Sequence, residues 1–216
     1  MDLIDGFDMT TGRAMYGTDT VLPGMLYASI ERPPVLGGTI VSLDDTKARE
    51  IPGVVDVVRM PDATSPPVFN PLGGVAVLAT NTWAATRARK RLNIEWDLGA
   101  NAEYDSAAYR EALIATSHEE GSPILTRGDV AAALESAATV IEADYYAPHL
   151  AHASMEPPAA TARMNPDGTC DVWSCTQNPQ SVQQTVSGLL DLEIGQVKAH
   201  VTLLGLSLIH ISEPTR

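Results

Sequence analysis

The stretch TARMNPDGTCDVWSCTQNPQSVQQTVSGLL, residues 161–190, indicates its local fold more clearly than any other part of the chain. Two short apolar runs flank Asp167-Gly168, a dipeptide typical of tight β-hairpin turns. After the second run, Asn178 and Pro179 favour a helix start, with asparagine as the N-cap and proline at the first helical position. The stretch therefore predicts a hairpin followed by a helix, and the run GQVKAHVTLL that comes next predicts another strand.

Upstream, short apolar runs alternate with turn residues, which predicts strands at about 25–31, 39–43 and 53–60. The continuous apolar run 73–79 predicts a further strand, and it is followed by a helix with Asn81 or Thr82 as cap and by a strand at 93–97. A strand–helix–strand run of this kind favours parallel pairing through a right-handed crossover.

The middle of the chain predicts an amphipathic helix at about 105–117, a second helix within 128–137 and a strand at 139–147. The strand prediction rests on the alternation of apolar and polar residues in TVIEADYYA. The whole pattern indicates a mixed α/β chain in two lobes, without an internal repeat.

Composition excludes several classes of function. The 216 residues carry a formal net charge of −13, which disfavours nucleic acid and anionic membrane surfaces as partners. No apolar run is long enough to span a membrane, and the acidic N-terminus lacks the pattern of an export signal, so the compartment, cytoplasm or periplasm, stays open. The two cysteines, Cys170 and Cys175, are too few for an iron–sulfur cluster, which needs about four ligands.

Two patches carry residues suited to chemistry. In PHLAHASMEPP (148–158), His149, His152 and Glu156 could ligate a metal, although histidines satisfied by local hydrogen bonds are more common and the spacing is not that of a zinc peptidase. In CTQNPQ, Thr176 and Gln177 lie between a strand end and a helix start, where side chains and backbone donors can meet an anion or a cofactor oxygen. The alternative is that Gln177 only closes the turn.

Three long segments resemble the xanthine dehydrogenase and aldehyde oxidase family, and within it the branch of the isoquinoline 1-oxidoreductase beta subunits. They are TTGRAMYGTDTVLPGMLYASIERPP (10–34), GGVAVLATNTWAATRARKRLNIEWD (73–97) and RGDVAAALESAATVIEADYYAPHLAHASMEPP (127–158). The motif TQNPQ at 176–180 adds to the resemblance, which covers nearly everything from Thr10 to Gly205.

The resemblance implies an α/β hammerhead domain at 10–97, a linker at 98–123, and the truncated first part of a molybdopterin-binding domain at 124–205. It also implies a molybdenum hydroxylase that uses oxygen from water to hydroxylate an N-heteroaromatic compound or to oxidise an aldehyde. The expected cofactor is molybdopterin, in its cytosine dinucleotide form. Because the pterin dithiolene holds the metal, no protein metal ligand is expected. Electrons are expected to leave through a small [2Fe-2S] partner subunit, in agreement with the low cysteine count.

The resemblance also assigns site residues one by one. Gln177 matches the glutamine near the oxo group of the metal, with Thr176 beside it, and Gly205 matches the first glycine of a loop that wraps the cofactor with backbone donors. His152, Met155 and Glu156 match a family motif, which implies a place near the cofactor or substrate. The catalytic glutamate of the family is expected beyond Gly205, so no catalytic residue is expected in this chain.

The last eleven residues, LSLIHISEPTR (206–216), do not continue the glycine-rich loop of the family and resemble a translated sequencing adapter. We therefore expect a non-native tail on a truncated chain that is inactive by itself. The alternative is a stand-alone, non-catalytic module that uses a hammerhead-type domain to bind a partner.

Overall fold

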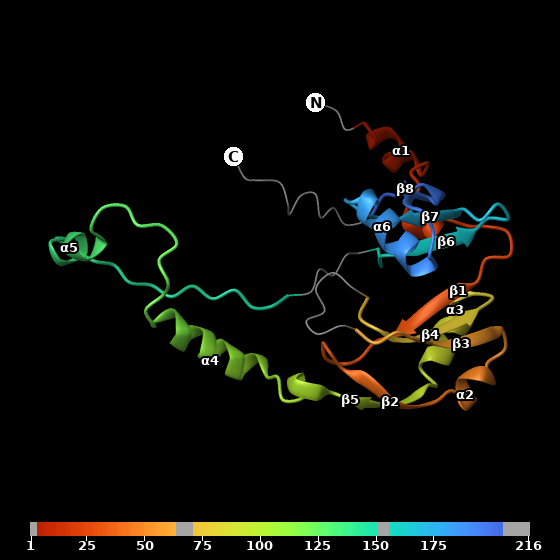
Figure 1. Ribbon diagram of the computed structural model, residues 1–216, viewed down its shortest axis with the longest axis horizontal. Helices are drawn as coiled ribbons and strands as arrows, with labels where there is room; N and C mark the ends of the chain where they lie inside the picture. The colour runs from red at the N-terminus through yellow and green to blue at the C-terminus, as the bar shows by residue number, and fades with distance from the viewer. Residues whose placement is uncertain (1–3, 64–70, 151–155, 205–216) are drawn as a thin grey trace. The chain divides into compact units, whose positions relative to one another are not determined.

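The computed structural model describes residues 4–63, 71–150 and 156–204, and the chain divides into two compact units (Figure 1). The continuous unit comprises residues 25–149, and the discontinuous unit combines residues 1–24 with 150–216. Both units contain helices and strands, which confirms the predicted mixed α/β class. Among the described residues, no helix is both long and apolar enough to cross a membrane.

The continuous unit contains two small antiparallel sheets. In the first, β4 (Gly74–Ala79) lies between β1 (Tyr27–Glu31) and β3 (Val54–Met60). In the second, β2 (Thr39–Asp44) pairs with β5 (Asn93–Asp97). The strands predicted at these positions are therefore present, within one or two residues at their ends.

The predicted parallel pairing of β4 and β5 is wrong. The helix between them, α3 (Thr82–Arg89), is present, but both edges of β4 are already hydrogen bonded to antiparallel neighbours. No edge is left for β5, which joins β2 in the other sheet.

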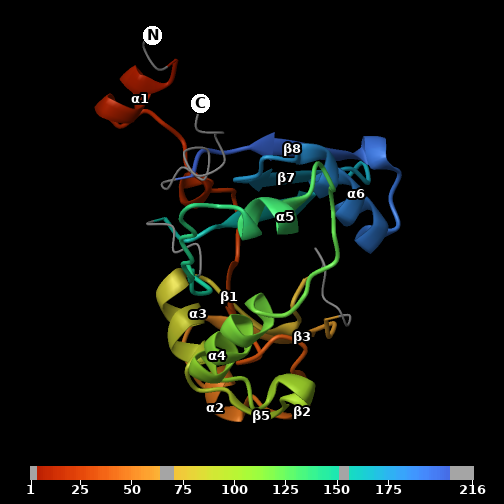
Figure 2. The same cartoon turned by 90° about the vertical axis from the view of Figure 1, so that its left-hand side faces the viewer.

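Small side chains let α3 pack closely on the first sheet, beside β1 and β4 (Figure 2). Ala84, Ala85 and Ala88 are buried on this helix, and Val75 and Val77 are fully buried on β4. The start of the helix is fixed by Asn81, whose side-chain oxygen accepts a hydrogen bond from the Ala84 amide at 2.8 Å. This confirms one of the two predicted caps and satisfies a backbone donor that the helix itself cannot satisfy.

Helices α2 (Thr46–Arg49), η2 (Gly99–Asn101), α4 (Ser106–Ser117) and α5 (Val130–Glu135) complete the continuous unit. The strand predicted at 139–147 is not formed, because these residues have no partner strand within the described part of the chain. An alternating pattern shows which side chains share a face, but a strand also needs a neighbour for its backbone.

The discontinuous unit is built on a three-stranded sheet, β6 (Ala160–Met164), β7 (Cys170–Ser174) and β8 (Val197–Val201), with β7 in the centre. β6 and β7 are antiparallel, whereas β7 and β8 are parallel. α6 (Pro179–Leu190) and η3 (Ile194–Gln196) connect the parallel pair. The N-terminal segment contributes α1 (Gly6–Thr11) and η1 (Gly17–Asp19).

The hairpin and the helix start predicted from residues 161–190 are both confirmed. The β6–β7 turn contains Gly168 at φ 82°, and the Gly168 amide donates to the Asn165 carbonyl at 3.0 Å. α6 covers one face of the sheet, where Cys170, Val172 and Val197 form a small core.

Candidate functional site

The turn between β7 and α6 places Thr176 and Gln177 at the carboxyl end of the central strand. The Thr176 amide donates to the Ser174 carbonyl at 3.1 Å, and the Thr176 hydroxyl accepts from the Asn178 amide at 3.0 Å. The Asn178 side chain in turn accepts from the Ser181 amide at 3.1 Å and starts α6. Thr176 therefore stabilises the turn, and the turn does not depend on a hydrogen bond from the Gln177 side chain.

Gln177 is exposed, and its side-chain amide makes no hydrogen bond to any residue that the structure describes. Of the two interpretations of this glutamine, closure of the turn thus loses its support, because Thr176 and Asn178 supply the hydrogen bonds of the turn. The amide is free to bind a group from outside the turn.

Because β7 and β8 are parallel, the carboxyl end of β8 lies at the same edge of the sheet as Gln177, which follows the carboxyl end of β7. Ser174 is in register with Val201, and the Thr202 amide donates to the Ser174 carbonyl at 3.1 Å. Ligands of open α/β sheets bind at the carboxyl ends of parallel strands, which is the position of this edge. Gly205 follows three residues after Thr202 and lies outside the described residues.

Two buried hydroxyls at this edge lack hydrogen-bond partners among the described residues. They are Ser174 Oγ at the end of β7 and Thr202 Oγ1 just after β8. A buried hydroxyl without a hydrogen-bond partner costs free energy. A polar group that reached these hydroxyls would therefore gain by hydrogen bonding to them.

The N-terminal segment lies against the same edge. Tyr16 forms a parallel bridge with Leu203, and the Leu203 amide donates to the Met15 carbonyl at 3.3 Å. A side chain at Gly17 would lie 3.2 Å from the Ala159 carbonyl oxygen and 3.4 Å from Thr202 Oγ1. Glycine therefore allows this close approach of the segment.

Glu156 is held by the N-terminal segment. Its Oε1 accepts from the Thr18 amide at 3.2 Å and from the Thr18 hydroxyl at 3.1 Å. Because Thr18 directly follows Gly17, the structure brings Glu156 into the neighbourhood of the strand edge that carries Gln177. The two other residues of the same predicted motif, His152 and Met155, lie outside the described residues.

His149, the remaining residue of the possible metal cluster, has a partner 45 positions earlier in the chain. Its Nδ1 lies 3.2 Å from the Tyr104 hydroxyl, and its ring packs against that of Tyr109. Within residues 4–63, 71–150 and 156–204, no group of three histidine, cysteine or acidic side chains is placed to hold a metal ion.

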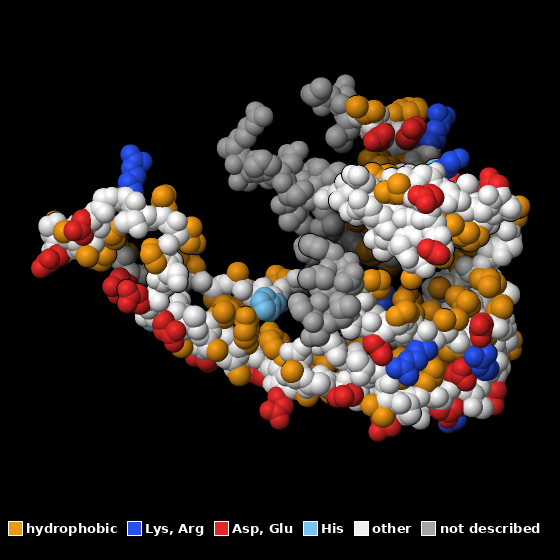
Figure 3. All heavy atoms as spheres, viewed as in Figure 1, with side chains coloured by type: hydrophobic (Ala, Val, Ile, Leu, Met, Phe, Trp, Pro, Cys, Tyr) orange, Lys and Arg blue, Asp and Glu red, His pale blue; other side chains and the backbone are white. Residues whose placement is uncertain are grey.

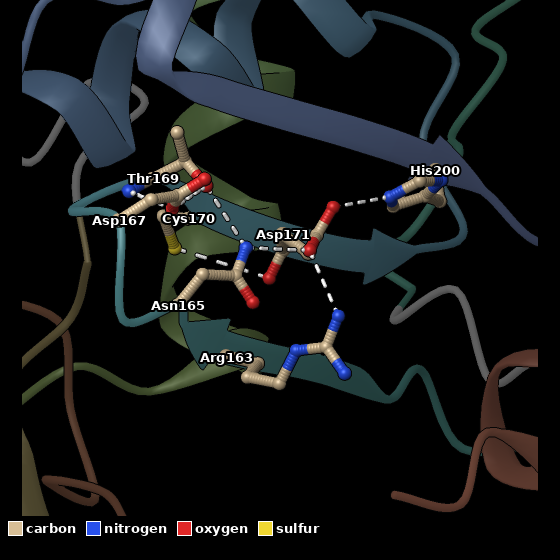
Figure 4. Close-up of polar contacts among 7 residues, drawn as sticks. All are labelled: Arg163, Asn165, Asp167, Thr169, Cys170, Asp171 and His200. Atoms are coloured by element: carbon tan, nitrogen blue, oxygen red, sulfur yellow. Dashed lines mark hydrogen bonds and ion pairs between the residues drawn. The ribbon is translucent and has the colours of Figure 1, made fainter.

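Sequence reasoning missed a polar cluster on the sheet face opposite α6. Asp171 on β7 accepts hydrogen bonds from Arg163 at 3.0 Å and from Asn165 at 2.8 Å, and its other oxygen lies 2.8 Å from His200 Nε2 (Figure 4). The His200 ring stacks on Trp173, with 4.8 Å between the ring centres.

These contacts lower the pKa of Asp171 far below its ordinary value, with the hydrogen bond to His200 as the largest cause, followed by those to Asn165 and Arg163. The alternation of Asp171 and Trp173 with Cys170 and Val172 was a visible signal that one face of β7 is not purely apolar. Which cross-strand residues would meet Asp171 depended on the sheet order, which the sequence does not state.

Comparison with known proteins identifies the relatives of the chain. Residues 116–206 match the molybdopterin cofactor-binding domain family. The chain is 31% identical, over 90% of its length, to the isoquinoline 1-oxidoreductase subunit beta of Brevundimonas diminuta, and covers 25% of that protein. It is 27% identical, over 94% of its length, to the xanthine dehydrogenase molybdenum-binding subunit of Escherichia coli O157:H7, of which it covers 31%.

A solved structure supports the fold. Quinoline 2-oxidoreductase from Pseudomonas putida 86 matches 94% of this chain with a TM-score of 0.68 and 21% identity, and the match covers 30% of that protein's chain. Together these findings confirm the resemblance to the xanthine dehydrogenase and aldehyde oxidase family of molybdenum enzymes. The chain spans about a quarter to a third of the length of the relatives it matches.

Proposed function

We propose that this chain is part of the large subunit of a molybdenum hydroxylase, with an α/β hammerhead domain at 10–97, a linker at 98–123 and the first part of the cofactor domain at 124–205. The parent subunit would use oxygen from water to hydroxylate an N-heteroaromatic compound or to oxidise an aldehyde. The family match over 116–206 and the names of the relatives support this assignment of class.

The observation that carries the proposal is the position of Gln177 at the carboxyl ends of β7 and β8, with a side-chain amide that makes no hydrogen bond to the described residues. The donors and hydroxyls at this edge suit a cofactor rich in oxygen and nitrogen, because Ser174 Oγ and Thr202 Oγ1 are buried without partners in the described part of the chain. When bound, the molybdenum cofactor supplies the oxidation chemistry of the family.

The residues of the chain hold and orient that cofactor in the proposed site. Gln177 would donate a hydrogen bond to an oxygen ligand of the metal, and a neutral amide does so without adding charge to a centre whose charge changes during turnover. Thr176 would keep the glutamine in place, and the backbone at Gly205 would supply donors. Glu156 would hold the N-terminal segment beside the site, with His152 and Met155 nearby.

In this proposal, oxidation of the substrate and transfer of the electrons take place on different subunits. A small [2Fe-2S] subunit would receive the electrons, since two cysteines cannot ligate a cluster here. The cofactor would be the cytosine dinucleotide form of molybdopterin. The present chain would be inactive alone, because the catalytic glutamate of the family is expected beyond Gly205.

The test compares Gln177→Ala with Gln180→Ala in a parent subunit whose reading frame continues past Gly205. Both glutamines are exposed, but Gln180 lies in the first turn of α6 and is given no role in the site. We expect Gln177→Ala to lower turnover or molybdenum content by about 10–100-fold, as is typical for contacts around metal ligands, and Gln180→Ala to have little effect. Full activity and metal content in Gln177→Ala would contradict the proposed site.

The chain of 216 residues provides a second arm of the test. Purified from a host that makes the cofactor, it should contain no stoichiometric molybdenum and no pterin. Stoichiometric molybdenum in this chain would show that the cofactor does not need the remainder of the subunit.

A further inference from the structure

The segment 139–149, which follows α5, lies along α4 in the opposite direction. His118, directly after the helix, has its Nε2 3.3 Å from Asp144 Oδ2. Further along, the Arg110 guanidinium lies 5.1 Å from the centre of the Tyr146 ring. These contacts hold one side of the segment against the helix.

The contacts with α4 involve alternate side chains. Asp144 and Tyr146 face the helix, whereas Ile141 and Tyr145, at odd-numbered positions, are 88% and 95% exposed. Large exposed side chains of this kind continue along the part of the chain that carries α4, as the hydrophobic atoms in Figure 3 show. All residues of 139–147 are exposed, but the side chains that contact α4 alternate with the most exposed ones, as they would in a β-strand.

The backbone of the same residues also lacks hydrogen bonds to the backbone of the described chain. No amide or carbonyl of residues 139–147 is hydrogen bonded to another backbone group of the described chain. Extended segments with free backbone groups and alternating side chains add to exposed sheet edges, where the backbone supplies affinity and the side chains supply specificity.

We propose that residues 139–147 form a β-strand that pairs with a sheet edge in the remainder of the parent polypeptide, with Ile141 and Tyr145 packed on apolar side chains of that sheet. The inference rests on the proposed function in one respect, that the chain is part of a longer subunit. The segment lies inside the family match at 116–206, and the matched relatives are three to four times as long as the chain.

A second copy of the chain is a poorer partner for this segment. Residues 139–147 contain two acidic residues, Glu142 and Asp144, and no basic one, and the whole chain carries a net charge of −13. Two such strands side by side would place like charges close together, which is destabilising. The partner edge should instead be apolar, with neutral or basic residues beside the acidic positions.

Hydrogen–deuterium exchange tests the proposal directly. In the chain of 216 residues, the amides of 140–147 should exchange quickly at all concentrations. In the parent subunit, at the same pH and temperature, alternate amides of this segment should exchange at least about 100-fold more slowly. Equal exchange in both proteins would overturn the proposal, and so would slow exchange in the chain itself or protection that appears only as its concentration rises.

A substitution separates pairing from a general change in the subunit. Tyr145→Asp should abolish the protection in the parent subunit, Tyr145→Phe should retain it, and neither should change the urea midpoint of the chain, in which Tyr145 is exposed. Retained protection in a folded Tyr145→Asp subunit would contradict the assigned face. Molybdenum content and activity are separate measurements, so failure of the proposed function can be told apart from failure of the strand pairing.

Discussion

β4–α3–β5 in the continuous unit and β7–α6–β8 in the discontinuous unit have the same order of elements along the chain, but only the second forms a parallel pair. β4 has antiparallel neighbours on both edges, whereas β7 uses one edge for its hairpin partner β6 and keeps the other for β8. A strand–helix–strand run therefore predicts parallel pairing only where the first strand retains a free edge. The difference also decides which run can bind a ligand at the ends of its strands, because only parallel strands bring two carboxyl ends together.

The two central strands differ in their faces as well. β4 is buried on both faces by valine and alanine, whereas β7 is apolar toward α6 and carries Asp171 on the other side. A charge on β4 would have no partner, while the charge on β7 has three. Substitutions in the central strands β4 and β7, and at the start of the helix that follows each, test this difference.

The largest effect is expected from Val77→Asp in β4. Val77 is fully buried, so the new carboxylate would be unpaired and should destabilise the continuous unit by about 4 kcal/mol or more. The indole NMR signal of Trp96, which packs on this core, would report the loss during urea unfolding. Val55→Asp on the exposed side of β3 is the matched control, and a similar loss in that variant would mean that the burial of β4 is not the cause.

A smaller effect, dependent on pH, is expected from Asp171→Asn in β7. The hydrogen bonds to Asp171 depress its pKa in the folded protein below the unfolded value of about 3.9. The stability that they supply is therefore complete above about pH 5 and is lost as the pH falls through the unfolded value toward the folded one.

Urea midpoints of the discontinuous unit, followed through the indole signal of Trp173, should show this pH dependence. The Asp171→Asn variant should be less stable than the wild type at neutral pH, and the two should converge as the pH is lowered toward about 2. Parallel pH profiles for the two proteins would rule out the Asp171 cluster as the source, and the Trp96 midpoint should not respond to the substitution.

The smallest effects are expected at the two helix caps. Asn81→Ala and Asn178→Ala each remove one hydrogen bond from a side-chain oxygen to a helix amide and should cost about 0.5–2 kcal/mol. Asn81→Ala should shift only the Trp96 midpoint, and Asn178→Ala only the Trp173 midpoint. A shift of both midpoints in either variant would indicate that the two units do not unfold independently.

The features that could be predicted from sequence are those in which neighbouring residues supply the whole interaction. The Asp167-Gly168 turn and the caps at Asn81 and Asn178 are of this kind, and the structure has all of them. The location of Thr176 and Gln177 between a strand end and a helix start was also predictable. What the sequence could not show is that Thr176 closes the turn, so that the Gln177 amide has no hydrogen bond to the described residues.

The features that could not be predicted depend on partners far away along the chain. The alternation at 139–147 was visible in the sequence, but the sequence does not show that none of the described strands lies beside this segment. The partners of Asp171, among them His200 from a strand 29 positions later, follow only from the sheet order. The contact between Thr18 and Glu156 joins residues 138 positions apart, and no local pattern announces it.

The bridge between Tyr16 and Leu203 has a consequence for the order of events during synthesis. The discontinuous unit joins residues near 16 to residues near 203, so it cannot be completed until residue 203 has left the ribosome, whereas every residue of the continuous unit is available by residue 149. At about 5–20 residues per second, the 55 residues from 150 to 204 represent a delay of roughly 3–11 s. During that interval the N-terminal segment cannot form its bridge to Leu203, although all residues of the continuous unit are already available for folding.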